Sequence, residues 1–539
     1  MLPYSDSQFY TPSCHADAWH DTRRERIYRE NQEAKIITPG ADKSQFLSAK
    51  AADEKHLSVK WTLCNSWLEY ALEQERKEVY RMEQTAVKNA EIIAGLDVLE
   101  ERKNSILLKN EGCGGNGLQC DSNSVSGAVS QRACVYCGAR VVLNPITDAF
   151  HIVHGPIGCA SYTWDIRGSL SSGEDLYRNS FSTDLKEQDV IFGGEKRLAA
   201  AIDEVVEKHH PKLIFIYATC IVGVIGDDVE SVCKTMSAKH NIRVIPVKSP
   251  GFSGNKSVGY KMACNAIMEL LLPHKDQEKR RGINILGDFN LAGEVWIVKD
   301  YLNKIGIPVV ATITGDSDYE TLIKAPSAQL NVVQCAGSST YLASRMEEEM
   351  GIPYIKISFY GIEDTINSLV RIAEALGDEA ARKKAIAFGE TEKARLKEFL
   401  SIYRRNLEGK KAAIYVGGGF KAISLIRQFK SLGMDTVVVG TQTGKKDDYE
   451  IIESIVNKDT VILDDANPAE LERFMKEKGA DILVGGVKER PLAYKLGIAF
   501  CDHNHERKHP LCGFDGVVNF TKEINQSMNN PVWRYIKNK

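Results

Sequence analysis

Short runs of apolar, β-branched residues alternate with helix-like stretches from about residue 131 to the end of the chain. Each run holds about four to eight apolar residues, ends in small or polar residues and leads into an amphipathic stretch. The clearest runs are KLIFIYATC, IRVIPVKS, INILGDFN, PVVATITG, YIKISFYG, AAIYVGGG, DTVVVGT and DILVGG. Strands that are apolar along their whole length are typical of parallel sheets with both faces buried. The pattern predicts an α/β fold of doubly wound, Rossmann-like units.

Charged stretches indicate where one predicted unit ends and the next begins. A charged stretch at 276–282 and a charged, helix-like stretch at 390–410 each precede a fresh apolar run. We therefore expect three α/β domains, at residues 131–280, 281–400 and 401–539.

Residues 1–130 have a different character and are expected to form a helical extension and a linker. Between about 44 and 103 the sequence lacks proline, and apolar residues recur at near-helical spacing. Residues 112–130 are rich in glycine and serine without any periodicity, which predicts a loop. This loop contains Cys113 and Cys120, which are either ligands or ordinary thiols.

The composition excludes several classes of protein. The 539 residues carry a net charge of −3, so the charge balance does not indicate a nucleic acid or an anionic membrane as partner. No basic segment with an apolar core opens the chain, and its longest apolar stretch is too short to span a bilayer. Thirteen scattered cysteines, an odd number, indicate reduced thiols. We expect a cytoplasmic protein that binds neither nucleic acid nor membrane.

Three cysteines lie in glycine-flanked turns at similar points of successive strand-like segments. They are Cys134 in RACVYCG, Cys159 in HGPIGCA and Cys220 in YATCIVGVIGDD. Thiolates on such turns, spaced too widely for a zinc knuckle, suit a shared iron–sulfur cluster better than structural zinc. Cys137 completes a C-x-x-C pair with Cys134, but without a second pair it is interpreted as a small buried hydrophobe.

A second group of possible ligands comes from distant parts of the sequence. Near the C-terminus, CDHNHERKHPLCGFDG brings two cysteines and three histidines together, and His503 or His505 is a possible iron ligand. Cys335, between a predicted strand and a predicted helix, is the matching thiolate candidate. The alternative is that the histidines only cap helices and donate hydrogen bonds at a subunit interface.

Residues 131–539 resemble the α-type subunits of nitrogenase component 1 and its relatives. The resemblance lies in the strings HIVHGPIGCASYTWDIRGSLSSG, STDLKEQDVIFGGEKRL, TCIVGVIGDD, GFSGNKSVGYK, GDFNLAGE, LNVVQCAGSS and NNPVW. It implies three α/β domains and an α2β2 assembly with a homologous β-type subunit. It also implies an ATP-dependent, homodimeric iron protein as the electron donor.

The resemblance further implies two metal groups. An interface cluster, of P-cluster or 4Fe-4S type, would be held by the thiolates of Cys134, Cys159 and Cys220. A larger iron–sulfur cofactor, an iron–molybdenum cofactor or its all-iron precursor, would be held by Cys335 and His503. An organic acid such as homocitrate on that cofactor would be bound by Lys488.

The chain departs from the family's pattern in the cofactor loops. Counting back from GFDG places the cofactor histidine on His503, whereas counting forward from Lys488 places Asn504 there. Where dinitrogen-reducing members have a glutamine and a histidine, this chain has Lys256 and Tyr260.

The arginine that the family has after its GG turn is also absent. Phe420 stands in its place and is followed by Lys421. Because these losses remove polar groups that position substrate and cofactor, dinitrogen reduction is not expected.

Two functions are consistent with these features. The first is a catalytic subunit similar to methylthio-alkane reductase, which cleaves carbon–sulfur bonds of small thioethers. The second is a non-catalytic E-type subunit of the cofactor-assembly scaffold, which SSGEDLYR and HIVHGPIGC resemble most. We expect the reductase, because a long segment precedes Cys134 and because the cofactor loop offers histidines. Lys256, Tyr260 and Lys421 are then the candidates for substrate, cofactor-anion or proton-donor roles.

Overall fold

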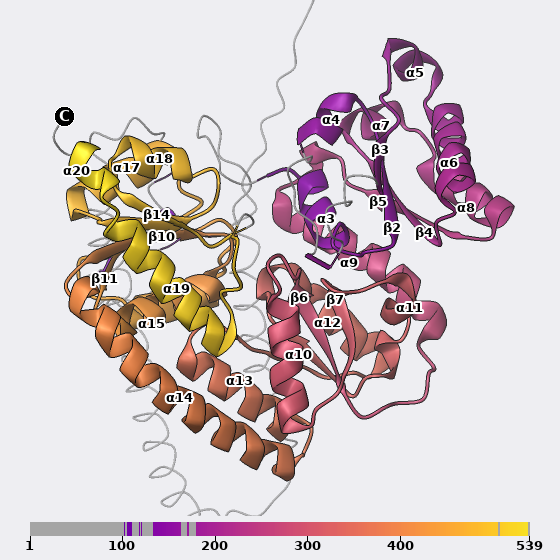
Figure 1. Ribbon diagram of the computed structural model, residues 1–539. Helices are drawn as coiled ribbons and strands as arrows, with labels where there is room; N and C mark the ends of the chain where they lie inside the picture. The colour runs from indigo at the N-terminus through magenta and orange to yellow at the C-terminus, as the bar shows by residue number, and fades with distance from the viewer. Residues whose placement is uncertain are drawn as a thin grey trace, which may run out of the picture. The chain divides into compact units, whose positions relative to one another are not determined.

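A computed structural model describes residues 102, 105–109, 118, 120, 133–162, 170–171, 179–504 and 507–536. All of these residues belong to the compact unit that spans Arg81–Lys539. They form three β-sheets, which follow one another along the colour bar of Figure 1 from purple through pink to orange and yellow. No helix of this described part is both long enough and apolar enough to cross a membrane.

The first sheet has four parallel strands in the order β3-β2-β4-β5. Its strands are β2 (Ala149–His154), β3 (Ser180–Ser182), β4 (Leu213–Ala218) and β5 (Arg243–Lys248). The helices of this region are α3 (Val135–Leu143), α4 (Ile157–Tyr162), α5 (Glu187–Phe192), α6 (Glu195–His209), α7 (Cys220–Ile225), α8 (Val229–His240) and α9 (Lys256–Leu271). β4 is buried along its whole length, as its unbroken apolar run predicts.

The second sheet also has four parallel strands, in the order β7-β6-β8-β9. Its strands are β6 (Ile283–Asp288), β7 (Val309–Thr314), β8 (Leu330–Val333) and β9 (Tyr354–Lys356). The helices between them are α10 (Glu294–Ile305), α11 (Tyr319–Leu322) and α12 (Ala336–Met350), and α13 (Ile362–Ala375) and α14 (Glu379–Leu407) lead on to the third sheet.

The third sheet has six strands in the order β1-β12-β11-β10-β13-β14. Five are parallel: β10 (Lys411–Val416), β11 (Asp435–Thr441), β12 (Val461–Asp464), β13 (Ile482–Gly485) and β14 (Ala499–Asp502). Its helices are α15 (Gly419–Ser431), α16 (Lys446–Ile455), α17 (Pro468–Lys478), α18 (Arg490–Lys495), α19 (Gly513–Met528) and α20 (Val532–Ile536).

Two shared hydrophobic cores connect the sheets. One contains Leu213 of the first sheet together with Leu286 and Val333 of the second. The other contains Ile283 of the second sheet together with Ile414 of the third. The carboxyl ends of strands from different sheets are therefore held in one packed unit, which is where ligands bind in α/β proteins.

The α/β fold class with doubly wound parallel sheets is confirmed, and each apolar run named above contains a strand. One strand differs from the expectation. β1 (Ile106–Leu108), within the predicted extension and linker, pairs antiparallel with β12 at the edge of the third sheet. The proposed helix at 44–103, apart from Arg102, and Cys113 lie outside the described residues.

Candidate functional site

Two of the three cysteines of the first sheet, Cys134 and Cys220, lie beside Gly251. Cys134 precedes α3, Cys159 lies in α4 and Cys220 begins α7, and all three are half-buried free thiols. The backbone N–H of Gly251 donates a hydrogen bond to Cys220 Sγ at 3.0 Å. A Cβ atom at position 251 would lie 3.0 Å from Cys220 Sγ and 3.7 Å from Cys134 Sγ, so only glycine leaves room there.

Electrostatics place Cys159 in the same group. Burial raises the pKa of Cys159, a hydrogen bond with the Thr219 side chain opposes this, and Cys220 and Cys134 add to the rise. Within the described residues, no group of three or more His, Cys, Asp or Glu side chains is arranged to hold a single metal ion. Thiolates are the donors that iron–sulfur clusters take, so the residue types of this group fit such a cluster.

Cys335 lies at the start of α12, two residues after β8, and is half-buried. Gly287, at the end of β6, approaches it closely with φ +82°, in the left-handed region that favours glycine. A Cβ atom on Gly287 would lie 2.9 Å from Cys335 Cβ. The end of β6 therefore packs directly against Cys335, and position 287 has no space for a side chain.

His503 directly follows β14 and is completely buried. Neither ring nitrogen has a hydrogen-bond partner among the described residues, although the ring packs edge-on against Tyr360 and Phe520. Burial moves the pKa of His503 well below its usual value, so the imidazole is neutral and its lone pair is available. A buried imidazole without partners costs free energy unless a ligand occupies it.

Lys421, in the first turn of α15, connects His503 with Cys335. Its Nζ donates a hydrogen bond to the backbone oxygen of His503 at 3.0 Å and lies 5.6 Å from the centre of the Tyr360 ring. Burial and the nearby Arg507 lower the pKa of Lys421 to about 8, whereas Cys335 raises it. The structure thus brings three of the predicted residues together, from two sheets.

Lys256 and Tyr260 approach Cys335 from the first sheet. They share the first turn of α9, and Lys256 Nζ lies 5.9 Å from the centre of the Tyr260 ring. Burial disfavours the charged ammonium, but Tyr260, Cys137 and Cys335 outweigh this and raise the pKa of Lys256. Burial likewise raises the pKa of Tyr260, so its hydroxyl keeps its proton.

The sequence analysis missed a buried charged cluster beside this group. Arg507 Nε donates to Glu294 Oε1 at 2.5 Å, and both side chains are almost fully enclosed. Burial, followed by repulsion from Glu294, raises the pKa of Asp288 to about 7. Glu294 and Arg507 lie too far apart in the chain for any local sequence pattern to pair them.

Three further candidates from the sequence are Lys488, Asn504 and His505. Lys488 is exposed between β13 and α18. A Cβ atom on Gly486 would lie 2.6 Å from Asn504 Nδ2, so Asn504 packs against that turn, while His505 lies outside the described residues.

The triple-glycine turn at 417–419 serves two purposes. Cβ atoms on Gly417 and Gly418 would meet no described atom within 4 Å, which leaves open space near Lys421. A Cβ on Gly419 would collide with Asp448 of α16 at 2.4 Å. Gly419 therefore allows α16 to pack closely, and the first two glycines leave space beside Lys421.

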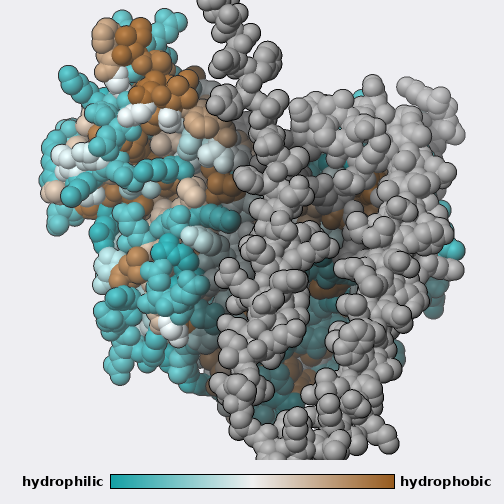
Figure 2. Space-filling model, turned by 180° about the vertical axis from the view of Figure 1, so that it is seen from behind, coloured by the Kyte–Doolittle hydropathy of each residue, from teal (hydrophilic) through white to brown (hydrophobic). Residues whose placement is uncertain are grey.

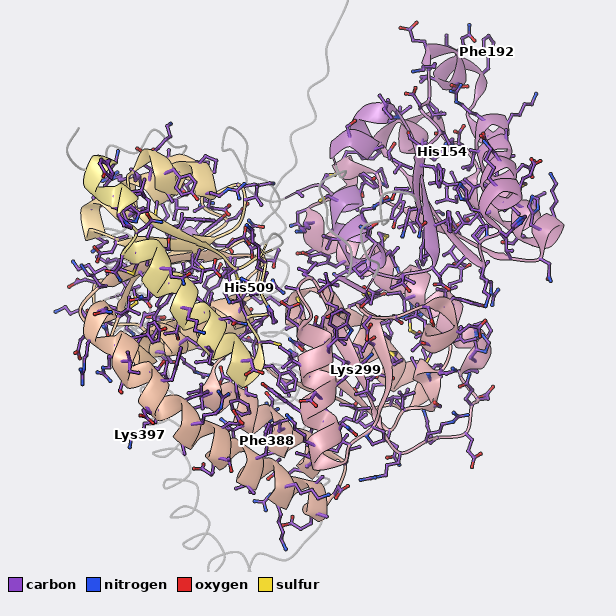
Figure 3. The ribbon with its side chains drawn as sticks, viewed as in Figure 1. His154, Phe192, Lys299, Phe388, Lys397 and His509 are labelled. Carbon is purple, nitrogen blue, oxygen red and sulfur yellow. The ribbon has the colours of Figure 1, made fainter. Side chains whose placement is uncertain are left out.

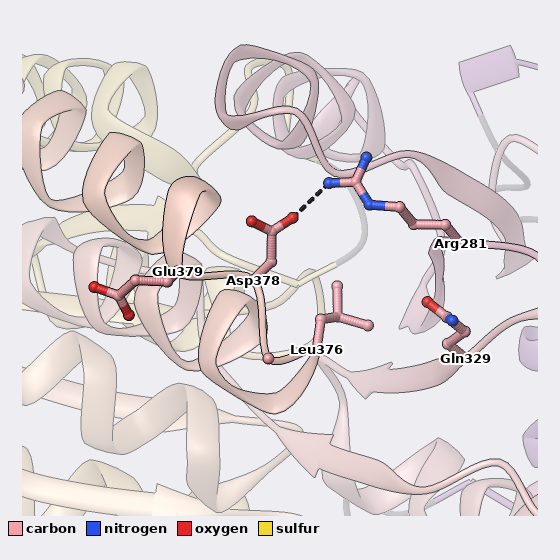
Figure 4. Close-up of a pocket in the computed structure, with 6 residues that line it drawn as sticks. Arg281, Gln329, Leu376, Asp378 and Glu379 are labelled. Carbon is pink, nitrogen blue, oxygen red and sulfur yellow. Dashed lines mark hydrogen bonds and ion pairs between the residues drawn. The ribbon is translucent and has the colours of Figure 1, made fainter.

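A surface pocket elsewhere contains none of the predicted site residues. It is lined by Arg281, Gln329, Leu376, Gly377, Asp378 and Glu379 (Figure 4). Arg281 and Asp378 form an ion pair within it, so its main charges already satisfy one another. In the histidine pair of β2, His154 Nε2 is hydrogen-bonded to Asp227 and His151 Nδ1 to Tyr217.

Comparison with known proteins identifies the family. The model of the nitrogenase component 1 type oxidoreductase family matches residues 134–529. The chain belongs to this family. A solved structure described as nitrogenase Cp1 at pH 5 covers 83% of this chain and 99% of its own, with 31% identity and a TM-score of 0.75.

Two similar relatives are called nitrogenase iron-molybdenum cofactor biosynthesis protein NifE. One, from Clostridium pasteurianum, is 68% identical over 445 residues, which cover 82% of this chain and 97% of the relative. The other, from Methanosarcina barkeri, is 55% identical over 458 residues, which cover 83% and 99%.

These relatives contradict the expected catalytic subunit of methylthio-alkane reductase type. Relatives that are 46–68% identical carry the name of a cofactor biosynthesis protein, not that of a reductase. The long segment before Cys134 and the presence of His503 were therefore poor evidence for an enzyme.

Proposed function

We propose that this chain is the E-type subunit of a scaffold on which a precursor of the iron–molybdenum cofactor is assembled, and that it does not itself turn over a substrate. The names of its similar relatives support this role. The observation that carries the proposal is the fully buried His503, whose ring nitrogens have no hydrogen-bond partner in the part of the chain that the structure describes. Lys421 donates to the backbone oxygen of His503 and is also within electrostatic range of Cys335.

The inner group, which we define as Cys335, His503, Lys421 and Lys256, suits an iron–sulfur precursor as cargo. Cys335 supplies a thiolate and His503 a neutral imidazole, the donor types that iron accepts. Lys421 and Lys256 supply positive charge that offsets the negative charge of such a cargo in a poorly hydrated interior. Lys488 is proposed to contact an organic acid on the cargo from the exposed rim.

The outer group, which we define as Cys134, Cys159 and Cys220, suits a cluster shared with a second subunit. Cys134, Cys159 and Cys220 are half-buried and provide part of a ligand set, so a homologous β-type subunit would complete it. Such a cluster would supply one-electron chemistry, and an ATP-dependent iron protein would be the donor. This chain's residues hold the thiols in position and limit the access of water to them.

A transfer experiment tests the scaffold role. The chain is purified anaerobically with its partner subunit, loaded with precursor, and mixed with a cofactor-deficient nitrogenase component 1. We expect the acceptor to gain the iron that the complex loses. An acceptor that gains no iron while the complex keeps its own would contradict the role.

The matched control is Lys397→Met, which changes an exposed lysine of α14 that has no part in the proposed binding of cargo (Figure 3). This variant is expected to transfer precursor, whereas Lys421→Met is expected to load poorly and to transfer little.

A further inference from the structure

Two charged side chains are buried where the second and third sheets are joined. Charged residues usually lie on the surface, and hydrophilic residues (teal) cover much of the described face in Figure 2. The side chains of Arg507 and Glu294 are instead only 4% and 0% exposed. Arg507 lies four residues after His503, whereas Glu294 begins α10, the helix between β6 and β7. The pair therefore joins the segment that carries His503 to the second sheet, which carries Cys335.

The guanidinium of Arg507 bonds on two sides. Its Nε donates to Glu294 Oε1 at 2.5 Å. Its Nη1 donates to the backbone oxygen of Asn504 and lies 3.4 Å from that of His503. Backbone oxygens that lose contact with water require donors, and Arg507 supplies one at the turn that directly follows β14. One side chain thus holds this turn and ties it to α10.

Glu294 is itself fixed by its own segment. Its second carboxylate oxygen accepts a hydrogen bond from the backbone N–H of Ala292 at 2.8 Å. Its backbone oxygen lies 3.5 Å from Cys512 Sγ. Because both carboxylate oxygens are occupied, Glu294 offers Arg507 an attachment point that does not move freely.

The start of α19 is attached to α10 without Arg507. The N–H of Phe514 donates to Tyr301 Oη of α10 at 3.0 Å. A Cβ atom on Gly513 would lie 2.6 Å from the Tyr301 ring, so the two helices meet closely here. Loss of Arg507 should therefore release the turn at His503 and leave the attachment of α19 intact.

Stability of the fold alone does not account for this pair. Removing two charges from water is costly, and apolar side chains of similar volume often stabilise a protein as well or better. A guanidinium differs from apolar groups, and from an ammonium, because its donors have a fixed planar arrangement. Such a group can bond a carboxylate on one side and consecutive backbone oxygens on the other.

We propose that Arg507 is a positioning residue for the cargo site, and that with Glu294 it sets the separation between His503 and Cys335. Two ligands from different sheets bind one rigid cargo only when their separation matches it. A change in this separation therefore weakens binding at the His503 end. In this respect the inference rests on the proposed function.

The main variant is Arg507→Lys, which keeps a positive charge beside Glu294 but loses the planar set of donors. The full chain with its partner subunit is prepared anaerobically. Its affinity for the iron–sulfur precursor and the urea midpoint of the cargo-free protein are both measured. We expect the affinity to fall about 10–100-fold, as for other residues that orient a metal ligand, while the midpoint stays the same.

Pulsed electron paramagnetic resonance of the loaded complexes separates positioning from stabilisation. The nitrogen coupling of His503 to the iron of the cargo should weaken in Arg507→Lys, while the Cys335 thiolate still holds the iron. The matched control is Tyr301→Phe, which removes the bond to Phe514 at the far end of the same segment. This control is expected to keep both the affinity and the coupling.

If Arg507→Lys does not fold, the double variant Arg507→Met, Glu294→Gln serves for the same measurements, because it leaves neither charge of the pair unpaired. Unaltered affinity and coupling in the variant that is measured overturn the proposal, as does an equal fall in Tyr301→Phe. A fall in affinity that is matched by a fall in the urea midpoint also overturns it, since the pair would then only stabilise the fold.

Failure of the scaffold role has a different signature. It is seen in the unaltered chain, which would then bind or transfer no precursor. Failure of the present inference is seen only when the variants are compared with an unaltered chain that does bind it.

Discussion

The outer cysteines and the inner group differ in what surrounds them. Cys134, Cys159 and Cys220 are half-buried in turns of one sheet, where Gly251 already donates to a thiol. His503 is completely buried, and neither of its ring nitrogens has a hydrogen-bond partner among the residues that the structure describes. On the proposed function, the outer group is a partial ligand set that another subunit would complete, whereas the inner group would be filled, and later left, by a cargo.

Two variants, each of which lacks one proposed ligand, test this comparison most strongly. Cys335→Ala removes a direct ligand, so cargo affinity should fall by more than the roughly 10–100-fold that loss of a supporting residue costs. Cys134→Ala should instead deplete the outer cluster and leave the cargo. Iron content and electron paramagnetic resonance of both anaerobic variants measure this. Loss of the same iron from both would show that the two groups are not separate.

Lys421→Met tests the charge of the inner group. The variant keeps the bulk of the side chain but loses the ammonium, so cargo affinity should fall about 10–100-fold, as for a supporting residue. Equilibrium loading at pH 7 measures it. If the variant binds cargo as tightly as the unaltered chain, the ammonium of Lys421 does not contribute to binding.

The same ammonium predicts a dependence on pH. The pKa of Lys421 is lowered to about 8 by burial and Arg507, so in the empty protein the amine loses its charge above that pH. Anionic cargo favours the charged form, and loading must therefore take up a proton at higher pH. Affinity should be constant below about pH 7 and fall by up to about tenfold per pH unit above about pH 8. Lys421→Met should remove this decline, and an identical decline in the variant would contradict it.

Asp288→Asn tests whether the buried carboxyl of Asp288 makes the stability of the fold depend on pH. Its folded pKa of about 7 lies above its ordinary value of 3.8, because of burial and Glu294. Between these values the folded state holds a proton that the unfolded state has lost, so stability declines as pH rises, by about 1.4 kcal/mol per unit. The variant should flatten this decline in urea unfolding between pH 5 and 7. If the free energy of unfolding of the variant declines with pH as steeply as that of the unaltered chain, a group other than Asp288 is responsible for the decline.

Lys488→Ala should have the smallest effect. The side chain is exposed, so the stability of the fold should change by less than about 0.5 kcal/mol. Binding of cargo that carries an organic acid should weaken slightly more than binding of cargo without one, and a comparison of the two loading curves measures this. Equal curves would leave Lys488 without a role.

Local patterns predicted the sheets well, because an unbroken apolar run such as β4 admits few alternatives to a buried parallel strand. They also located Cys220 and Cys335, since each follows such a run. They did not predict β1, whose three residues join a strand more than 350 positions later. The Glu294–Arg507 pair was missed for the same reason. Local patterns also left the register at His503 open, because burial of a side chain depends on tertiary packing.

Mössbauer spectroscopy of the 57Fe-loaded complex, before and after incubation with a cofactor-deficient acceptor, tests the central claim most directly. The account predicts that the signal of the inner iron disappears from the complex and that the signal of the outer cluster, held by Cys134, Cys159 and Cys220, remains. Retention of all the iron, or loss of the outer signal while the inner one stays, would contradict it.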